Sequence, residues 1–308
     1  MRVIITGGTG MIGQALAADL ARDGHDVVVL TRDPARVRGM SARVRAVGWD
    51  GRTAQGWAAE VEGAGAIVNL AGQRVAGMNP FAYRWTDARR RAICESRRDP
   101  GLAVTAAVEA ASEKPGVVVQ VSGVDYYAPT GEIAREDSPP GDGFMSHICA
   151  VCWEPPTAPV EALGVRRVVA RMGPVLHPGD GALPPLLLQS RLFVGGRLGS
   201  GRQWFSWVHI ADVVAALRFL IDTPEARGVF NLCAPNPVRN AALSETIGRV
   251  LGRPSFMVVP AFAMRLLYGA MADTLLKGVR ALPGRLQELG YRFKFPELEP
   301  ALRDLLGR

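Results

Sequence analysis

A glycine-rich turn near the start of the chain constrains the fold more than any other feature of the sequence. The residues Gly7-Gly8-Thr9-Gly10-Met11-Ile12-Gly13 follow an apolar run at 3–5. Residues 14–20 carry apolar side chains at helical spacing, so the pattern predicts a strand, a glycine turn and a helix. In such a unit the glycines permit a tight turn, a close approach of a pyrophosphate and close packing of the helix on the strand. The sequence therefore predicts a dinucleotide with its pyrophosphate at the helix N-terminus.

The end of the second expected strand bears on which dinucleotide is bound. This strand is expected at 26–30, where residues 27–30 are apolar, and it leads into Thr31, Arg32 and Asp33. A carboxylate at this place suits the ribose 2′-hydroxyl of NAD, whereas an arginine suits the 2′-phosphate of NADP. Arg32 therefore favours NADP(H). Two alternatives stay open, because Arg32 could be a solvated arginine and Asp33 could be the ribose ligand.

Strands alternate with helices through the first half of the chain. Further strands are expected at 44–49, 66–72, 117–122 and 164–171. This alternation predicts an α/β fold with a doubly wound parallel (Rossmann) sheet. We expect the NADP(H)-binding domain at 1–175, with 205–235 returning to it. A smaller, mainly helical substrate-side domain would comprise 176–204 and 236–308.

Composition excludes several classes of protein. With 48% apolar and 21% charged residues in 308, the chain has enough apolar residues for a full core and is not disordered. No apolar run is long enough to span a bilayer, and Met1 leads almost directly into the first strand. The four cysteines follow no disulfide-scaffold pattern, and packing accounts best for Cys149 and Cys152. We therefore expect a cytoplasmic protein.

The net charge of +7 raises the question of nucleic-acid binding. Only three of the 36 basic residues are lysines, and the arginines are scattered through expected helices. The densest basic run, at 89–91, has no interleaved aromatic residues. We therefore expect a small-molecule substrate and neither nucleic-acid nor membrane binding, with a homodimer as a candidate assembly.

Several motifs resemble a known family. They are the glycine turn, Asn69-Leu70-Ala71-Gly72, Arg84-Trp85-Thr86, Ser96-Arg97, Tyr126-Tyr127, Gly199-Ser200-Gly201-Arg202-Gln203-Trp204, Ser206-Trp207-Val208-His209 and Ala234-Pro235-Asn236-Pro237. With these motifs the chain resembles an atypical extended short-chain dehydrogenase/reductase of the sugar-nucleotide epimerase-like branch. Residues 282–305 resemble the small C-terminal domain that marks this branch. The resemblance implies NADP(H) binding and an oxidoreductase or epimerase ancestry.

The predicted cofactor site gathers residues from several strand ends. Its members are Gly7, Thr9, Gly10, Met11, Ile12, Gly13, Thr31, Arg32, Leu70, Ala71, Gly72, Arg97 and Arg171. Small residues after the fourth strand would let the backbone pass close to the cofactor.

The usual proton relay of short-chain dehydrogenases is missing. That relay is a Tyr-x-x-x-Lys pair, but the residues four positions before the three lysines are Ala110, Asp273 and Gly290. Ser122 matches the serine of the family's triad, and counting from it places His147 near the tyrosine position and Val151 near the lysine position. A histidine can exchange a proton near neutral pH.

The catalytic candidates are therefore Ser122, Tyr126, Tyr127 and His147. Either tyrosine would donate a proton or hold a substrate, and His147 is alternatively a surface residue. The predicted substrate-binding residues are Arg202, Trp204, Trp207 and His209, with Arg202 as an anion anchor. Alternatively, both tryptophans are interdomain core. Two function hypotheses remain: an NADP(H)-dependent oxidoreductase or epimerase, and a non-catalytic NADP(H)-binding sensor.

Overall fold

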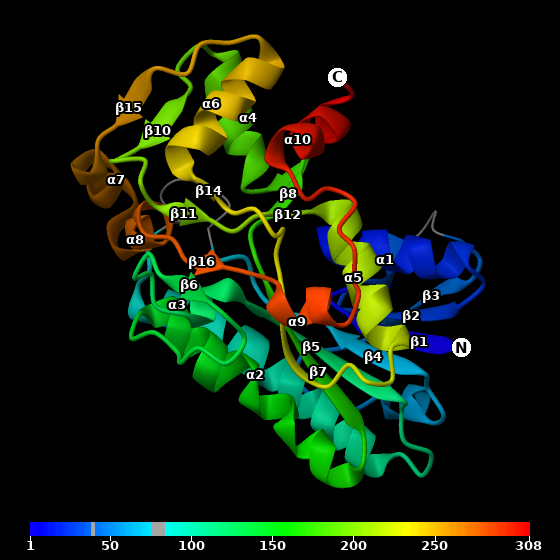
Figure 1. Ribbon diagram of the computed structural model, residues 1–308. Helices are drawn as coiled ribbons and strands as arrows, with labels where there is room; N and C mark the ends of the chain where they lie inside the picture. The colour runs from blue at the N-terminus through cyan, green and yellow to red at the C-terminus, as the bar shows by residue number, and fades with distance from the viewer. Residues whose placement is uncertain (38–40, 76–83) are drawn as a thin grey trace.

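A parallel sheet of seven strands forms the centre of the larger part of the protein (Figure 1). The computed structural model describes residues 1–37, 41–75 and 84–308. The strand order is β13-β7-β5-β4-β1-β2-β3. The bounds are β1 Arg2–Thr6, β2 Asp26–Thr31, β3 Val44–Gly48, β4 Ala66–Asn69, β5 Val117–Gly123, β7 Arg166–Met172 and β13 Gly228–Leu232. The predicted doubly wound Rossmann sheet is confirmed, and the order reverses between β1 and β4, where such sheets form their ligand crevice.

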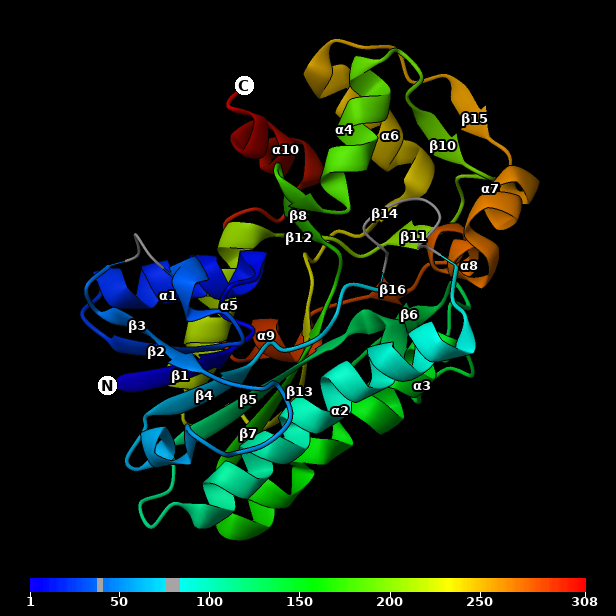
Figure 2. The same ribbon diagram turned by 180° about the vertical axis from the view of Figure 1, so that it is seen from behind.

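Helices cover both faces of the sheet. Consecutive residues of a strand point to opposite faces, so each strand contributes side chains to two cores. Val3 and Ile5 of β1 pack into one core with α1 (Met11–Arg22) and α5 (Ile210–Asp222). Ile4 packs into the other core with α2 (Asp87–Ala110). Figure 2 shows α2 running across its face of the sheet, opposite α1 and α5. The sequence predicts a helical region from about 80 to 111; α2 covers most of it, and residues 80–83 lie outside the described part of the chain.

A second, mainly helical region follows β7 and lies beyond the carboxyl ends of the strands (Figure 1). Its core surrounds the wholly buried Trp207 with side chains of three helices, α4 (Leu183–Arg191), α6 (Asn240–Leu251) and α10 (Leu298–Leu306). Between α6 and α10 in the sequence lie α7 Ala261–Tyr268, α8 Ala272–Leu276 and α9 Gly284–Glu288. The short strands are β8 Val175–His177, β9 Asp180–Gly181, β10 Gly196–Leu198, β11 Trp204–Phe205, β12 Val208–His209, β14 Val238–Arg239 and β15 Met257–Val259.

The end of the chain ties the two regions together. Leu286 of α9 and Tyr291 pack into the sheet core beside α5. The buried Asp212 of α5 accepts hydrogen bonds from the backbone N–H of Lys294 at 2.7 Å and of Phe295 at 2.9 Å. The segment after α9 is thus fixed to the larger region before α10 enters the smaller one.

The helical segment after residue 143 changes type twice. α3 (Phe144–His147) gives way to a π-helix at Ile148–Trp153 and then to a 3-10 helix at Pro155–Leu163. The 3-10 helix contains Pro155, Pro156 and Pro159, and proline does not continue an α-helix because it lacks the backbone N–H. The other 3-10 turns are Pro34–Val37, Ala58–Val61, Val124–Tyr126 and Gly269–Met271, and β6 is Ile133–Ala134 and β16 Arg280–Ala281.

One expectation about the cysteines is wrong. Cys152 does not serve packing alone, because its sulfur is bonded to that of Cys94, with 5.4 Å between the Cα atoms. The partners are 58 residues apart in the sequence. They meet because α2 packs along the π-helix, which spacing along the chain does not reveal. Cys149 and Cys233 are free and buried. Among the described residues, the structure contains no helix with the length and apolar character needed to cross a bilayer.

Candidate functional site

The glycine turn between β1 and α1 has the shape of a phosphate cradle. Gly7 adopts a positive φ of 64°, which favours glycine. A Cβ on Gly13 would lie 2.5 Å from the Cα of Gly8, and one on Gly8 would lie 2.7 Å from the side chain of Val29. α1 begins at Met11 after Gly10, whose N-cap position supplies no side-chain hydrogen bond to the first amides. These residues fit a pyrophosphate, because the turn admits no larger side chain and the helix N-terminus favours an anion.

The end of β2 presents one basic and one acidic residue. Thr31 is buried, and its hydroxyl accepts a hydrogen bond from the backbone N–H of Asp33 at 3.1 Å. A carboxylate oxygen of Asp33 accepts from the N–H of Ala35 at 3.2 Å. The side chain of Arg32 is exposed. The carboxylate is thus partly used within its own turn, whereas the guanidinium extends into solvent.

A buried polar chain fixes the ends of β1, β4 and β5. The Thr6 hydroxyl donates to Asn69 at 2.6 Å, and the Asn69 amide donates to Gln120 at 2.8 Å. The same hydroxyl accepts hydrogen bonds from the N–H groups of Leu70 and Ala71, each at 3.1 Å. A Cβ on Gly7 would lie 3.0 Å from the Leu70 carbonyl, so this loop passes directly over the glycine turn.

Arg97 of α2 forms part of the wall beyond Gly72. Its side chain is 4% exposed, donates to the carbonyls of Ile93 and Gln73 at 3.1 Å each, and lies 4.4 Å from the centre of the Trp153 ring. Burial lowers the pKa of Arg97 to about 10, so the side chain remains charged at neutral pH. A Cβ on Gly72 would lie 3.3 Å from this guanidinium, so Arg97 is placed at the loop where the cofactor is expected.

Ser122 lies at the carboxyl end of β5, next to a residue that the sequence did not single out for chemistry. Its hydroxyl is buried, and it forms no hydrogen bond of standard geometry to any of the described residues. The thiol of Cys149 lies beside it, and burial raises the pKa of that thiol to about 12. His147 is exposed at the end of α3. Residues two apart on a helix point in nearly opposite directions, so Cys149 rather than His147 faces Ser122.

The two tyrosines have different surroundings. Tyr127 is 2% exposed, its hydroxyl donates to Asn231 at 2.7 Å, and it accepts from Arg171 at 2.9 Å. Burial raises the pKa of Tyr127 to about 12. Tyr126 is half-buried, and the guanidinium of Arg171 lies 3.3 Å from the centre of its ring. Of the two tyrosines, Tyr126 is the one that retains solvent access.

Arg171 is held by a carboxylate that the sequence did not single out. Its Nε and Nη2 donate to the two oxygens of Glu154 at 2.8 and 2.9 Å. Burial alone would lower the pKa of Arg171, but the Glu154 carboxylate outweighs it and the pKa is raised. The third nitrogen donates to Tyr127. Every nitrogen of this predicted cofactor ligand therefore has a protein partner.

The predicted substrate residues separate into a buried and an accessible pair. Trp207 is wholly buried and donates to the Asn236 carbonyl at 3.2 Å. His209 is 2% exposed; it accepts from the Ala211 N–H at 3.0 Å and stacks on Phe295. Neither offers an accessible ring to a substrate in this conformation. Arg202 is exposed and Trp204 is half-buried on β11, which lies between the helices of the second region and β6 (Figure 1).

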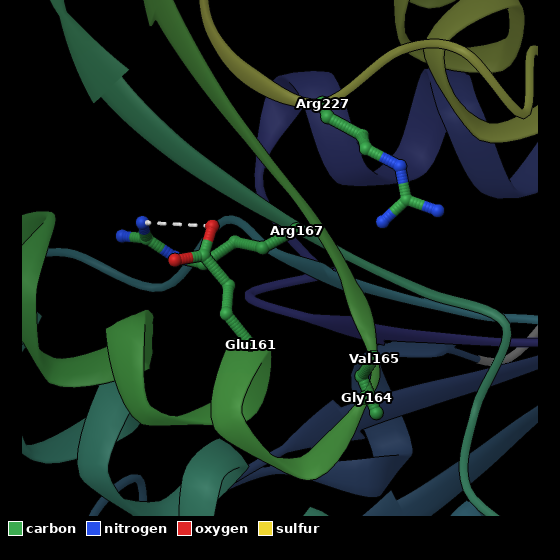
Figure 3. Close-up of a pocket in the computed structure, with 5 residues that line it drawn as sticks. All are labelled: Glu161, Gly164, Val165, Arg167 and Arg227. Carbon is green, nitrogen blue, oxygen red and sulfur yellow. Dashed lines mark ion pairs between the residues drawn. The ribbon is translucent and has the colours of Figure 1, made fainter.

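The described residues also line hollows outside the expected crevice. One of about 210 Å³ is lined by Glu161, Gly164, Val165, Arg167 and Arg227 (Figure 3). Gly164 and Val165 precede β7, so this hollow lies at the amino ends of the strands, opposite the expected crevice. The other, of about 250 Å³, lies between β15 and α6.

The sequence matches two family models. Residues 3–146 match the NAD dependent epimerase/dehydratase family, and residues 259–305 match a domain of unknown function, DUF1731. The chain is 36% identical to the epimerase family protein YfhF of Bacillus subtilis, with 100% of this chain and 98% of the relative covered. It is also 36% identical to the human epimerase family protein SDR39U1, with both chains fully covered.

Solved structures agree with this relationship. A crystal structure of human SDR39U1 (isoform 2) with NADPH covers both chains completely, with a TM-score of 0.88 and 34% identity. A nucleoside-diphosphate sugar epimerase from Corynebacterium glutamicum gives a TM-score of 0.78 at 30% identity, covering 100% of this chain and 58% of the other.

Proposed function

Because the chain belongs to the epimerase family represented by these relatives, we propose that it is an NADP(H)-dependent oxidoreductase or epimerase. Its substrate would be small and polar, and a nucleotide-linked substrate is included in that class. The observation that carries the proposal is the glycine cradle at the sheet's crevice, with the buried Ser122 hydroxyl and the half-buried Tyr126 at the end of β5. The NADPH-bound relative supports the choice of cofactor.

The cofactor would be held mainly by backbone groups. The turn from Gly7 to Gly13 would hold the pyrophosphate, and Arg32 would meet the 2′-phosphate. The loop 70–72 would pass along the cofactor, with Arg97 behind it. When bound, NADP(H) supplies hydride transfer at C4 of the nicotinamide.

Tyr126 is the proton donor that we favour. It is half-buried beside the strand end, and the Arg171 guanidinium against its ring restricts its position. Tyr127 is a weaker candidate because its hydroxyl has two buried partners and its pKa is raised to about 12. Ser122 would orient the substrate oxygen, since a hydroxyl donates a hydrogen bond without changing its charge. His147 is the other alternative and a weaker one, because it is exposed and Cys149 rather than His147 faces Ser122.

Single-turnover hydride transfer tests these roles. NADPH-loaded protein would be mixed with a panel of nucleoside-diphosphate sugars and small polar carbonyl compounds, and then Tyr126→Phe, Tyr127→Phe and His147→Gln would be compared on the responsive substrate. We expect Tyr126→Phe to slow hydride transfer by at least about a hundredfold, the lower range for general acid catalysis. Wild-type rates in Tyr126→Phe would contradict its role, and a comparable loss in His147→Gln alone would transfer the role to His147.

The second candidate function is a non-catalytic NADP(H)-binding sensor. The missing Tyr-x-x-x-Lys pair favours it. Tight NADPH binding without hydride transfer to any member of the panel would support the sensor and contradict the enzyme. Hydride transfer would exclude it.

A further inference from the structure

The disulfide between Cys94 and Cys152 joins α2 to the π-helix at Ile148–Trp153. Figure 2 shows α2 alongside α3, and the π-helix that follows α3 packs against α2. Cys152 is 2% exposed and packs with Ile93 and Ile148, whereas Cys94 is half-buried and retains access to solvent. A disulfide with one accessible partner is open to attack by a thiol in solution.

The disulfide lies next to the predicted cofactor residue Arg97. Arg97 follows Cys94 by three positions on α2, so the two side chains lie on the same face of the helix. Trp153 directly follows Cys152, and the Arg97 guanidinium lies 4.4 Å from the centre of its ring. The covalent bond and this cation–π contact therefore join the same two segments about one turn apart.

Arg97 connects these segments to the loop that is expected to pass along the cofactor. Its Nη2 donates to the Gln73 carbonyl at 3.1 Å, and a Cβ on Gly72 would lie 3.3 Å from the guanidinium carbon. A shift of the π-helix away from α2 would withdraw Trp153 from Arg97 and loosen the guanidinium behind this loop. The disulfide is therefore placed to brace the wall of the cofactor site.

Few directional interactions other than the disulfide hold the π-helix to α2. Within residues 1–37, 41–75 and 84–308, no hydrogen bond or ion pair joins α2 to Ile148–Trp153. The Thr105 hydroxyl donates to the Pro156 carbonyl at 2.7 Å, but Pro156 belongs to the 3-10 helix that follows. The Trp153 Nε1 and the Arg97 Nε are buried without a hydrogen-bond partner among the described residues. Apolar packing, the cation–π contact and the disulfide therefore fix the spacing of the two segments.

We propose that the Cys94–Cys152 disulfide is a thiol–disulfide exchange site for a dithiol reductant, and that its redox state sets the affinity of the protein for NADP(H). A thiolate of the reductant attacks the Cys94 sulfur, the S–S bond breaks, and Cys152 leaves as a thiolate that takes up a proton. The second thiolate of the reductant then attacks the reductant's own sulfur in the mixed disulfide. Cys94 leaves as a thiolate and takes up a proton, and the reductant becomes a disulfide. Two electrons and two protons thus pass from the dithiol to the protein.

Reduction removes the covalent link between α2 and the π-helix. Cofactor binding must then order Arg97 and Trp153, which the disulfide holds in place in the oxidised protein. We expect NADPH to bind about threefold to tenfold more weakly to the reduced protein, the range for ordering one or two side chains. By thermodynamic reciprocity, the bound cofactor should make the disulfide harder to reduce by the same factor. The inference rests on the proposed function only for the place of the cofactor beside the loop 70–72.

Fluorescence titration with NADPH tests the dependence on redox state. Oxidised protein would be compared with protein reduced by dithiothreitol, after maleimide labelling has counted the thiols in each. Cys94→Ser should bind as the reduced wild type does, with or without dithiothreitol. Cys233→Ala is the matched control: it removes a buried free thiol and should keep the full difference between the two states. Arg97→Met should bind NADPH weakly in both states, because it keeps the apolar stem and loses the guanidinium.

A second measurement uses the wild-type protein alone. The oxidised fraction would be measured over a series of ratios of reduced to oxidised dithiothreitol, with and without saturating NADP⁺, which cannot donate electrons. We expect NADP⁺ to raise the ratio at half-reduction by about threefold to tenfold. A disulfide that served stability alone would show the same ratio with and without NADP⁺.

The outcomes separate this proposal from the proposed function. Equal NADPH affinity in the oxidised and reduced wild type overturns it, as does a disulfide that dithiothreitol does not reduce in the native protein. A full dithiothreitol effect in Cys94→Ser places that effect at another site and also overturns it. A full difference retained in Arg97→Met overturns the route through Arg97. Neither measurement uses hydride transfer, so the substrate panel can fail while the redox dependence stands, and the reverse.

Discussion

The carboxyl edge of the sheet is built differently at β1, β2 and β4 than at β5 and β7. The first part is formed mainly by backbone. It consists of a glycine turn, a helix N-terminus without a side-chain cap, and a loop whose N–H groups donate hydrogen bonds to the Thr6 hydroxyl. In the second part, side chains bind one another. Arg171 is held by both oxygens of Glu154 and by Tyr127, and Tyr127 in turn by Asn231. The backbone groups of the first part are therefore available to a ligand. The polar side chains of the second part are largely hydrogen-bonded to one another.

This difference separates candidate ligand contacts from structural supports. A backbone cradle is preorganised for a ligand without any partner inside the protein. A satisfied buried network holds elements together, and its members reach a ligand only by giving up protein partners. We therefore expect substitutions in the second part mainly to lower the free energy of unfolding. Substitutions in the first part should weaken cofactor binding.

The largest expected effect is on the buried ion pair. Glu154→Gln leaves the Arg171 guanidinium, 4% exposed, without its carboxylate. We expect a loss of about 3 to 5 kcal/mol in the free energy of unfolding, as for other broken buried pairs. Urea unfolding measures it, with Glu60→Gln as the matched control. Glu60 pairs with an Arg45 side chain that is 50% exposed, and losing this pair should cost less than about 1 kcal/mol. Equal losses in the two variants would contradict the expected difference between the buried and the exposed ion pair.

The next effect tests the glycine cradle. Gly13→Ala places a Cβ 2.5 Å from the Gly8 Cα, so the turn and the helix must separate. Such overpacking destabilises by about 1 to 3 kcal/mol, and NADPH binding should weaken as the cradle deforms. Fluorescence titration with NADPH and urea unfolding measure the two effects. The control is Gly143→Ala, which has open space around its Cβ and a φ of −75°. A Gly13→Ala variant that binds NADPH as wild type does would show that the close packing is dispensable.

The sequence predicted the first part of this edge well because its signals are local. The glycine turn, its strand and its helix lie within residues 2–22, and their geometry follows from steric rules on neighbouring residues. The parallel strands and their helices follow from short periodic patterns in the same way.

The second part could not be predicted because its contacts join distant residues. Tyr127 and Asn231 are 104 positions apart, and Cys94 and Cys152 are 58 apart. Counting from Ser122 also does not show which way a side chain points: His147 is exposed at the end of α3, and the thiol of Cys149 lies beside Ser122. The Arg280 and Arg239 contacts with Trp204 arise from short strands that no periodic pattern marks.

A smaller effect concerns the choice of cofactor at the end of β2. Arg32→Ala should weaken NADPH binding about tenfold, or about 1.4 kcal/mol, and leave NADH binding unchanged, because only NADPH carries the 2′-phosphate. Parallel titrations with both cofactors measure this. Asp33→Asn is the companion variant: selective loss of NADH binding there would assign the ribose contact to Asp33. Equal effects of Arg32→Ala on both cofactors would contradict the phosphate role.

The smallest expected effect is a pH dependence in the second region. His209 is 2% exposed, and burial lowers its pKa from 6.5, although Asp304 and Asp212 oppose the shift. The unfolded chain therefore takes up a proton near pH 6.5 that the native protein does not yet bind. The stability attributable to neutral His209 is present above that pH and falls as the pH drops below it. His209→Asn keeps a side-chain acceptor for the Ala211 N–H and removes the titration.

We therefore expect the free energy of unfolding to fall less steeply with acid in His209→Asn than in wild type. Asp304→Asn should act in the opposite direction, because its carboxylate lies 3.3 Å from the imidazole and opposes the lowering of the pKa. Urea unfolding in steps from about pH 7.5 to about pH 5 spans the titration of an unfolded-chain histidine. Parallel slopes in wild type and His209→Asn would mean that the native imidazole takes up its proton as readily as the unfolded chain does. His209 would then be in contact with water rather than enclosed in the core around Trp207.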